Sequence, residues 1–205
     1  MTIYDFLAPV YGAWAALTEA KAHRLAMALL RRLPCERLLE VAVGTGKEIA
    51  SLSSDPGRGL CVGVDISAAM LKGARRSIGR TSAARGLLCQ ADAHALPFRA
   101  GSFDCVLCCY MIDLLPESDI PVVLREFHRV LRSRGRLVLV VMGKQALVVQ
   151  QAWMMLFRHV PALVGGCRPI QAASWLRNSG WDVESEEQTT QSGFRSKILA
   201  CCRLA

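Results

Sequence analysis

An apolar run that ends in a glycine turn, followed by a second apolar run that ends in an acid, constrains this 205-residue chain more than any other feature. Residues 38–48 read Leu-Leu-Glu-Val-Ala-Val-Gly-Thr-Gly-Lys-Glu, and residues 60–67 read Leu-Cys-Val-Gly-Val-Asp-Ile-Ser. Gly44 and Gly46 let the backbone turn sharply and approach a ligand where a Cβ would collide. Asp65, at the end of the second run, is placed to accept hydrogen bonds from both hydroxyls of a ribose. The pattern predicts a nucleoside site between two neighbouring strands.

The glycine spacing distinguishes between kinds of nucleoside site. A dinucleotide fingerprint requires Gly-x-Gly-x-x-Gly, whose third glycine lets the helix pack closely on the strand. Here Lys47, Glu48 and Ile49 follow Gly46. A phosphate loop requires Gly-x-x-x-x-Gly-Lys-Ser/Thr, and Glu48 stands where that hydroxyl would bind magnesium. The pattern that residues 40–46 do fit is acid-x-small-x-Gly-x-Gly. A nicotinamide-dependent oxidoreductase stays as an alternative that the missing third glycine disfavours.

That turn resembles the first motif of the class I S-adenosylmethionine-dependent methyltransferases, and further segments follow in the order of that family. Residues 66–71 continue as the family's ribose–adenine segment does, and residues 90–98 match its third-strand motif. Residues 102–109 match the fourth strand, and residues 126–140 match the next helix, turn and fifth strand. The opening Tyr-Asp-Phe-Leu-Ala-Pro-Val-Tyr at 4–11 is similar to that of the ubiquinone/menaquinone-biosynthesis-like and phospholipid N-methyltransferase-like group.

The resemblance implies S-adenosylmethionine as the cofactor. In the family the turn passes under the methionine part of the cofactor, and the acid at the Glu40 position orients the turn and the cofactor's ammonium. Ala42 replaces the usual first glycine of the motif. The cofactor-binding residues that the resemblance implies are Tyr11, Glu40, Ala42, Gly44, Gly46, Asp65, Ile66, Met70, Asp92, Ala93 and Cys108. Among them, Met70 is able to lie on the adenine, Asp92 bonds its amino group, and Cys108 offers its backbone carbonyl to the ammonium.

The catalytic residues are not assigned by the sequence. Methyl transfer from a sulfonium is an in-line displacement, so the protein mainly aligns the reactants and excludes water. A base is needed only if the acceptor carries a proton that must leave early. The candidates are Tyr11, which could cover the reacting methyl, and Asp113, which follows the fourth strand and could face the substrate. Cys105 and Cys108 lie three apart in a strand and therefore point to opposite faces, so we expect no metal site.

The order of the elements predicts an α/β fold with a doubly wound, mostly parallel seven-stranded sheet and an antiparallel C-terminal hairpin. Strands are expected at 38–43, 60–65, 86–90, 103–109, 135–142, 181–188 and 195–203, and helices at 13–33, 46–54, 67–79, 118–132, 144–160 and 170–179. The length suits a single domain over 1–205. Its expected parts are an N-terminal lid and helix (1–33), a cofactor-binding core (38–142), a substrate-region insertion (143–170) and a final helix and hairpin (171–205).

The composition limits the cellular setting and the partners. Hydrophobic residues make up 52% of the chain, as expected for a parallel sheet buried on both faces. No window is apolar enough to span a membrane, and the opening lacks a signal peptide, so we expect a cytoplasmic protein. The net charge of +8 suggests attraction to an anionic partner. The densest basic stretch contains Arg125, Arg129, Arg132, Arg134 and Arg136. Since no aromatic platform accompanies it, we expect no nucleic acid and leave peripheral membrane contact open.

The acceptor is expected to be small and lipophilic. Residues 153–157 and 161–164 are rich in large, adaptable apolar side chains, which either belong to the core or line a pocket. The predicted function is methyl transfer to a quinone-like molecule, a lipid head group or a natural product. A regulatory protein that binds the cofactor without transferring the methyl group is the alternative from another class. The oligomeric state is not determined by the sequence.

Overall fold

The computed structural model describes residues 16–80, 86–145, 155 and 168–204 of the chain. The described strands are β1 (Arg37–Val41), β2 (Leu60–Asp65), β3 (Leu87–Gln90), β4 (Phe103–Cys109), β5 (Leu131–Met142), β6 (Trp181–Gln191) and β7 (Phe194–Arg203). The helices are α2 (Ala20–Arg32), α3 (Lys47–Ser53), α4 (Ala68–Gly79), α5 (Ile120–Val130), α7 (Ala172–Asn178) and the 3₁₀ turn η1 (Ile112–Leu114).

The strands form one seven-stranded sheet in the order β3-β2-β1-β4-β5-β7-β6. The first five strands are parallel, and β7 runs antiparallel to both β5 and β6. The chain winds outward from β1 to β3 and then returns to the other side of β1 for β4. The loops after β1 and β4 therefore diverge, which is where open α/β sheets hold their ligands.

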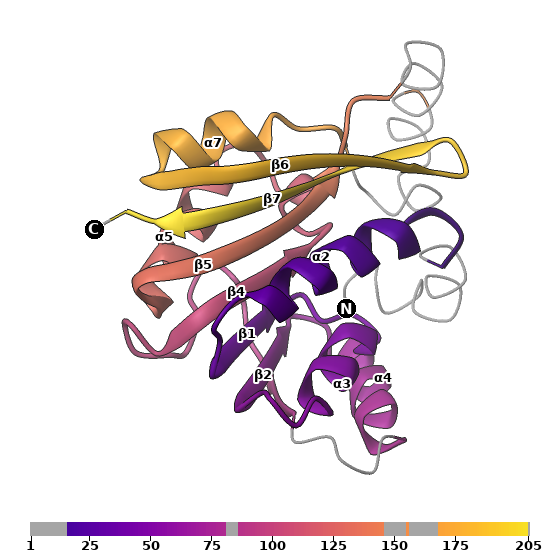
Figure 1. Ribbon diagram of the computed structural model, residues 1–205, viewed down its shortest axis with the longest axis vertical. Coiled ribbons are helices and arrows are strands. Elements are labelled where there is room, and N and C mark those ends of the chain that lie inside the picture. The colour runs from indigo at the N-terminus through magenta and orange to yellow at the C-terminus, as the bar shows by residue number, and fades with distance from the viewer. Residues whose placement is uncertain (1–15, 81–85, 146–154, 156–167, 205) are drawn as a thin grey trace.

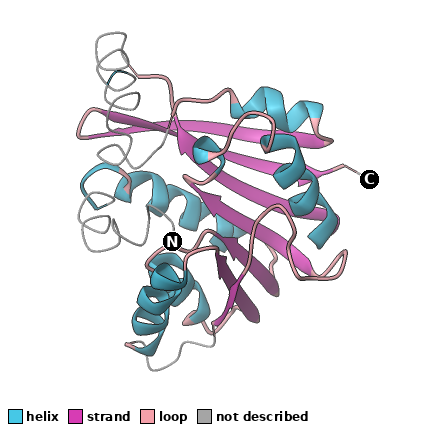
Figure 2. Cartoon of the chain, turned by 180° about the vertical axis from the view of Figure 1, so that it is seen from behind, coloured by secondary structure: helices cyan, strands magenta, loops and turns pink. Residues whose placement is uncertain are grey.

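Helices cover both faces of the sheet (Figures 1 and 2). One core cluster joins α2, α3 and α4 to side chains such as Cys105 and Leu107 of β4. The other joins α5 and α7 to Val106 and Cys108 of the same strand. All four of these β4 residues are fully buried, as the unbroken apolar run requires of a strand covered on both faces. Cys105 and Cys108 thus point to opposite faces, as the strand period predicts.

The predicted fold class is confirmed, and the differences lie at the ends of elements. Helix α5 ends at Val130, because Leu131 has extended dihedral angles and begins β5. Within β5, Arg134 takes a φ of 58°, in the turn that the sequence places at residues 133–134. The helix expected at 144–160 and most of the apolar segment behind it lie outside the described residues. Among the described helices, none has the length and apolarity that crossing a bilayer requires.

Two arginines of the basic stretch form ion pairs with acids of the fold. Both pairs lie at the amino edge of the sheet, where the parallel strands begin. Arg132 is paired with Asp104 at 3.0 Å, and Arg136 forms an ion pair with Glu184. The Oδ2 atom of Asp104 also accepts hydrogen bonds from the backbone N–H groups of Glu36 and Arg37, each at 2.8 Å. These side chains fasten the start of β1 to β4 and β5.

The two glycines of the turn after β1 have different surroundings. Both have left-handed backbone angles, with a φ of 52° for Gly44 and 77° for Gly46. A Cβ on Gly46 would lie 2.5 Å from both Cα and Cβ of Ala74 in α4, whereas a Cβ on Gly44 would meet nothing within 4 Å. Gly46 therefore allows α3 and α4 to approach closely, and the freedom of Gly44 is needed only for the turn.

We expect Gly46→Ala to destabilise the fold more than Gly44→Ala does. Backbone strain is common to both substitutions, so it cancels in the comparison. The collision with Ala74 should cost Gly46→Ala roughly 1–3 kcal/mol in addition. Urea unfolding of the two variants gives the difference directly. Equal losses of stability would contradict close helix packing at Gly46.

Candidate functional site

Two adjoining cavities open at the carboxyl edge of the sheet and meet at Ala42. The first, here called the acidic cavity, has a volume of about 90 Å³. The second, here called the apolar cleft, has a volume of about 390 Å³. Ala42 follows β1 and lines both of them. One elongated ligand with a polar and an apolar end could occupy both.

The carboxylate of Asp65 holds the turn after β1 in place. Its Oδ2 atom accepts a hydrogen bond from the backbone N–H of Gly44, and its Oδ1 atom accepts one from that of Ser67, each at 2.9 Å. The Ser67 hydroxyl in turn caps α4 by accepting from Met70 N at 3.2 Å. Asp65 is 8% exposed and lines the apolar cleft. Asp65 therefore joins the turn after β1 to the start of α4 at the wall of the apolar cleft.

Ala42 explains why the resembling family prefers glycine at this position. Its φ of 61° lies in the left-handed region, which costs a residue with a Cβ roughly 1–2 kcal/mol. Such strain persists where the surroundings enforce it, and it concentrates at functional sites. The turn after β1 keeps its shape despite this alanine, because Val43 N bonds Val64 O at 3.0 Å and Gly46 N bonds Val43 O at 2.8 Å.

The apolar cleft combines a hydrophobic wall with two carboxylates. Its lining consists of Val41, Ala42, Val64, Asp65, Ile66, Ala91, Asp92, Ala93, His94, Met111, Leu114 and Leu115. Asp92 Oδ1 accepts hydrogen bonds from His94 N at 2.9 Å and from the His94 ring at 2.6 Å. These bonds lower the pKa of Asp92. The same contact, with help from Asp119 at 3.4 Å, raises the pKa of His94.

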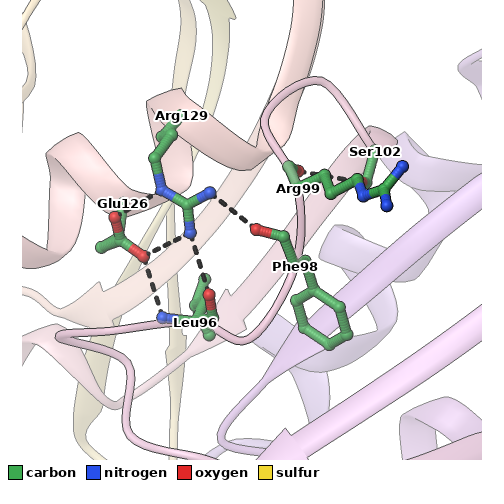
Figure 3. A network of polar contacts seen from close by, with 6 residues as sticks. All are labelled: Leu96, Phe98, Arg99, Ser102, Glu126 and Arg129. Carbon is green, nitrogen blue, oxygen red and sulfur yellow. Dashed lines mark hydrogen bonds and ion pairs between the residues drawn. The ribbon is translucent and has the colours of Figure 1, made fainter.

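Two side chains of α5 fix the loop that leaves this cleft (Figure 3). Glu126 Oε2 accepts a hydrogen bond from Leu96 N at 2.8 Å. Arg129 donates to the carbonyls of Leu96 and Phe98, at 2.9 and 2.6 Å, and pairs with Glu126 at 2.7 Å. The loop after Asp92 and His94 is thus tied to a rigid helix. A substitution at Arg129 would disturb the cleft without touching its ligand.

The acidic cavity gathers ionisable groups from four elements. Its lining consists of Ala16, Ala20, His23, Glu40, Ala42, Val43, Gly44, Thr45, Lys47, Glu48 and Cys109. Glu40 is 4% exposed, and its Oε2 atom has no hydrogen-bond partner among the described residues. Burial and the neighbouring Glu48 charge raise the pKa of Glu40 well above its usual range, although His23 opposes this. A buried carboxylate without a partner favours a cationic ligand.

His23 lies between two carboxylates at the wall of this cavity. Its Nδ1 lies 3.1 Å from Glu48 Oε1, and its Nε2 lies 3.7 Å from Glu19 Oε2. Burial disfavours the charged ring, yet Cys109 and the Glu19 and Glu48 carboxylates raise the pKa of His23 well above its usual value. Because burial raises the pKa of Cys109 to about 11, its sulfur is a neutral thiol at pH 7. The two carboxylates therefore favour the charged form of the ring.

Three residues that the sequence analysis expects in the cofactor site, Met70, Cys108 and Gly46, pack within the helix and strand layers. Met70 is buried in α4, and Cys108 is fully buried in β4; neither lines a cavity. Gly46 packs against α4, as described above. Tyr11 lies outside the described residues.

Asp113 lines neither the acidic cavity nor the apolar cleft. It is fully buried in η1, and its Oδ2 atom accepts a hydrogen bond from Met142 N at 2.7 Å. Its Oδ1 atom has no partner among the described residues. The contact ties the end of β5 to the loop after β4, so the observed role of Asp113 is structural.

Apart from Glu40, the sequence reasoning missed the ionisable side chains that line the acidic cavity. These are His23, Lys47, Glu48 and Cys109. Strand alternation would have pointed to Cys109, because Glu40 pairs in register with Leu107 and Cys109 lies two residues further on the same face. His23 carries no such signal, because it reaches the cavity from α2 only through the packing of that helix on the sheet.

Comparisons of family, sequence and structure each find proteins that are similar to this chain. A family model described as "Methyltransferase domain" matches residues 38–135. The chain is 29% identical to the demethylmenaquinone methyltransferase of Lactococcus lactis over 94% of this chain and 80% of that protein. It is 30% identical to the ubiquinone/menaquinone biosynthesis C-methyltransferase of Teredinibacter turnerae, over 83% of this chain and 69% of the relative.

Solved structures share the fold. The magnesium protoporphyrin IX methyltransferase of Synechocystis, crystallised with bound SAH, superposes with a TM-score of 0.71. The match covers 89% of this chain and 82% of that one at 20% identity. Within the described parts of the present chain, no group of three or more His, Cys, Asp or Glu side chains is arranged to hold a metal ion.

Asp113 makes stability depend on pH. Burial raises its pKa to about 7, against the opposing hydrogen bond from Met142, whereas the unfolded value is about 3.9. The protonated form is the one the fold favours. The stability that Asp113 contributes is therefore complete below about pH 4 and is lost as pH rises to about 7.

We expect Asp113→Asn, which keeps an acceptor for Met142, to gain stability relative to wild type between pH 5 and pH 8. The gain should be on the order of 2–4 kcal/mol and is measured by denaturant unfolding at both pH values. Asp182→Asn, an exposed site in β6, is the control and should show no such change. A difference for Asp113→Asn that stays constant with pH would contradict the buried-carboxyl argument.

Proposed function

This chain belongs to the class I S-adenosylmethionine-dependent methyltransferases, in their ubiquinone/menaquinone-biosynthesis-like group, and we propose that it methylates a ring carbon of a lipophilic quinol. The observation that carries the proposal is the similarity, over most of the chain, to proteins named for quinone methylation. We propose both the identity of the acceptor and the role of each site residue.

S-adenosylmethionine, the cofactor of this enzyme class, supplies a methyl group already activated on a sulfonium sulfur. The residues that line the two cavities suit the amino-acid end and the adenosine end of the cofactor. We assign the amino-acid end to the acidic cavity, where Glu40 would receive the ammonium. The ribose hydroxyls would bond to Asp65, and the adenine would lie in the apolar cleft beside Ile66, Asp92 and Ala93. Ile66 is 51% exposed in the cleft, so its side chain is available to a ligand.

The turn after β1 would pass between the amino-acid end and the adenosine end of the cofactor. Ala42 lines both cavities and Gly44 lines the acidic one, so their backbone would pass beneath the sulfur. Gly46 would act by fixing the start of α3. Met70 and Cys108 would act from behind the site, Met70 as packing for α4 and Cys108 through its backbone.

The chemistry of a quinol explains why no side-chain base need face the acceptor. In the reduced ring, an oxygen lone pair raises the electron density of the neighbouring carbon, whose electron pair forms the new bond to the methyl carbon. The C–S electron pair would stay on sulfur, and the methylated ring carbon would pass its proton to solvent once the site opens, which restores the aromatic ring. The chain's task is to align the two carbons and exclude water. Met111, Leu114 and Leu115 provide an apolar wall near the adenosine end.

A transfer assay tests the acceptor. The protein is incubated with S-adenosylmethionine labelled on its methyl group and with a short-chain demethylmenaquinone reduced to the quinol. We expect label in the ring methyl of the product and none when the acceptor is kept oxidised. Phosphatidylethanolamine and a simple phenol serve as matched acceptors that present nitrogen and oxygen. Transfer to either of these but not to the quinol would overturn the acceptor assignment.

Asp65→Asn should weaken cofactor binding. The substitution removes the charge and replaces one acceptor oxygen with a donor, which conflicts with either Gly44 N or Ser67 N. Loss of a hydrogen bond to a charged group costs about 1.5–3 kcal/mol, or roughly a 10- to 150-fold rise in Kd. Calorimetry with S-adenosylhomocysteine measures it, with Asp182→Asn as the control. Unchanged affinity in a folded variant would remove Asp65 from the ribose site.

A further inference from the structure

The tip of the β6–β7 hairpin is hydrogen-bonded to the start of α2, although Gln191 and Lys21 are 170 residues apart in the chain. Gln191 Oε1 accepts a hydrogen bond from Lys21 N at 2.6 Å. Gln191 Nε2 donates to the carbonyls of Ala16 and Leu17, at 3.0 and 2.8 Å. Ser192 Oγ donates to the same Leu17 carbonyl at 2.9 Å. The hairpin tip and the start of α2 lie on the same side of the molecule (Figure 1).

Gln191 supplies the N-terminal cap of α2 from another segment of the chain. The first N–H groups of a helix have no partner within it, and the side chain of the residue just before the helix commonly accepts from one of them. Glu19 holds that position but makes no capping bond, and its carboxylate lies 3.7 Å from the ring of His23 instead. Gln191 accepts from Lys21 N and donates to two carbonyls that precede the helix. One side chain therefore joins the helical turn at 16–18 to α2.

The hairpin presents Gln191 from a rigid frame. Ser192 and Gly193 join the two strands and have φ angles of 49° and 79°, as the tight two-residue turns of hairpins require. Gln191 pairs in register with Phe194 at the start of β7. Phe194 is buried, and its ring centroid lies 6.4 Å from that of Tyr110. Because the tip is anchored in this way, its contact with α2 restrains the start of the helix.

The segment that Gln191 holds forms part of the wall of the acidic cavity. Ala16, Ala20 and His23 line the cavity beside residues of β1, the turn after it and α3. We propose that the hairpin tip is a latch, in which Gln191 holds the start of α2 against the acidic cavity and thereby slows the release of the cofactor's amino-acid end. Gln191 does not itself line the cavity, so it is a positioning residue. The inference rests on the proposed placement of the cofactor.

The latch is the part of the α2 attachment that can open without unfolding the core. The hydrogen bonds of Gln191 and Ser192 lie at the exposed surface, where water replaces a broken bond at little net cost. The rest of α2 is fastened by buried side chains, among them Ala22, Ala26 and Leu30. Local opening begins where few buried contacts resist it. The start of α2 therefore opens before the remainder of the helix.

Thermodynamic linkage makes the latch measurable from both sides. If closing the latch raises the affinity for a ligand by some factor, binding of that ligand must stabilise the latch by the same factor. Only a ligand that reaches the acidic cavity gains from the wall that α2 provides. The alternative is that the contact between Gln191 and α2 stabilises the fold alone, with no effect on any ligand.

Two ligands test the latch. S-adenosylmethionine carries the amino-acid end, and 5′-methylthioadenosine lacks it. We expect Gln191→Ala to raise the Kd of S-adenosylmethionine about 5- to 30-fold, chiefly through faster dissociation. The same variant should leave the affinity for 5′-methylthioadenosine unchanged. Gln188→Ala replaces an exposed glutamine on the same strand and is the matched control, which should change neither ligand. Calorimetry gives the two Kd values, and stopped-flow displacement gives the dissociation rate.

Hydrogen exchange tests the latch in the wild-type protein. The N–H of Lys21 is bonded to Gln191, so its exchange rate reports how often the latch opens. We expect S-adenosylmethionine to slow this exchange by about the factor that Gln191→Ala adds to the Kd. Saturating 5′-methylthioadenosine should leave the exchange of the Lys21 amide unchanged.

The outcomes are distinct. If Gln191→Ala weakens both ligands equally, the hairpin tip supports the whole site and the inference is wrong. A variant that is less stable to urea but keeps the wild-type Kd and dissociation rate for S-adenosylmethionine also overturns it. Should Gln191→Ala fail to fold, the wild-type exchange decides, since an unchanged rate at Lys21 on binding S-adenosylmethionine contradicts the latch. Failure of the wild type to bind either ligand would instead refute the cofactor placement itself.

Discussion

The position of β1 in the sheet is the constraint on which the rest of the site depends. β1 pairs in parallel with β2 on one side and with β4 on the other, and the chain reverses its direction of winding at this strand. Glu40, near the end of β1, and Ala42, just after it, lie at that reversal, beside the ends of both neighbouring strands. Asp65 then closes the arrangement, since its carboxylate bonds the backbone of the turn after β1. The acidic cavity, the apolar cleft and their junction all follow from the strand order.

The strand and helix order could be predicted because it is encoded locally. Unbroken apolar runs mark strands buried on both faces, and the turn after β1 is marked by Gly44 and Gly46. Asp65 could be named because it ends the strand that follows the turn, and Glu40 because the motif that the turn resembles carries an acid at that position; the two residues line the two cavities. Ala42 is instructive, because the sequence shows a departure from glycine and only the φ of 61° shows that the chain tolerates strain there.

The remaining features could not be predicted because they depend on contacts between distant segments. The collision that a Cβ on Gly46 would make involves Ala74, which belongs to another helix. The burial of Asp113 depends on its contact with Met142 at the end of β5. His23 reaches the acidic cavity from a helix that carries no recognisable motif. In each case the sequence names the residue, but the partner is set by how the layers pack.

The charge of the whole chain is a poor guide to the charge at the site. The net charge is +8, yet Arg132 and Arg136 lie at the amino edge of the sheet, paired with acids. The carboxyl edge holds Glu40, Asp65 and Asp92 instead. Carboxylates gathered at one edge make the local potential there more negative than the net charge of the chain suggests. The hydrophobic wall of the apolar cleft lies at the same edge of the sheet, so the strand order brings charged and apolar surfaces together within one site.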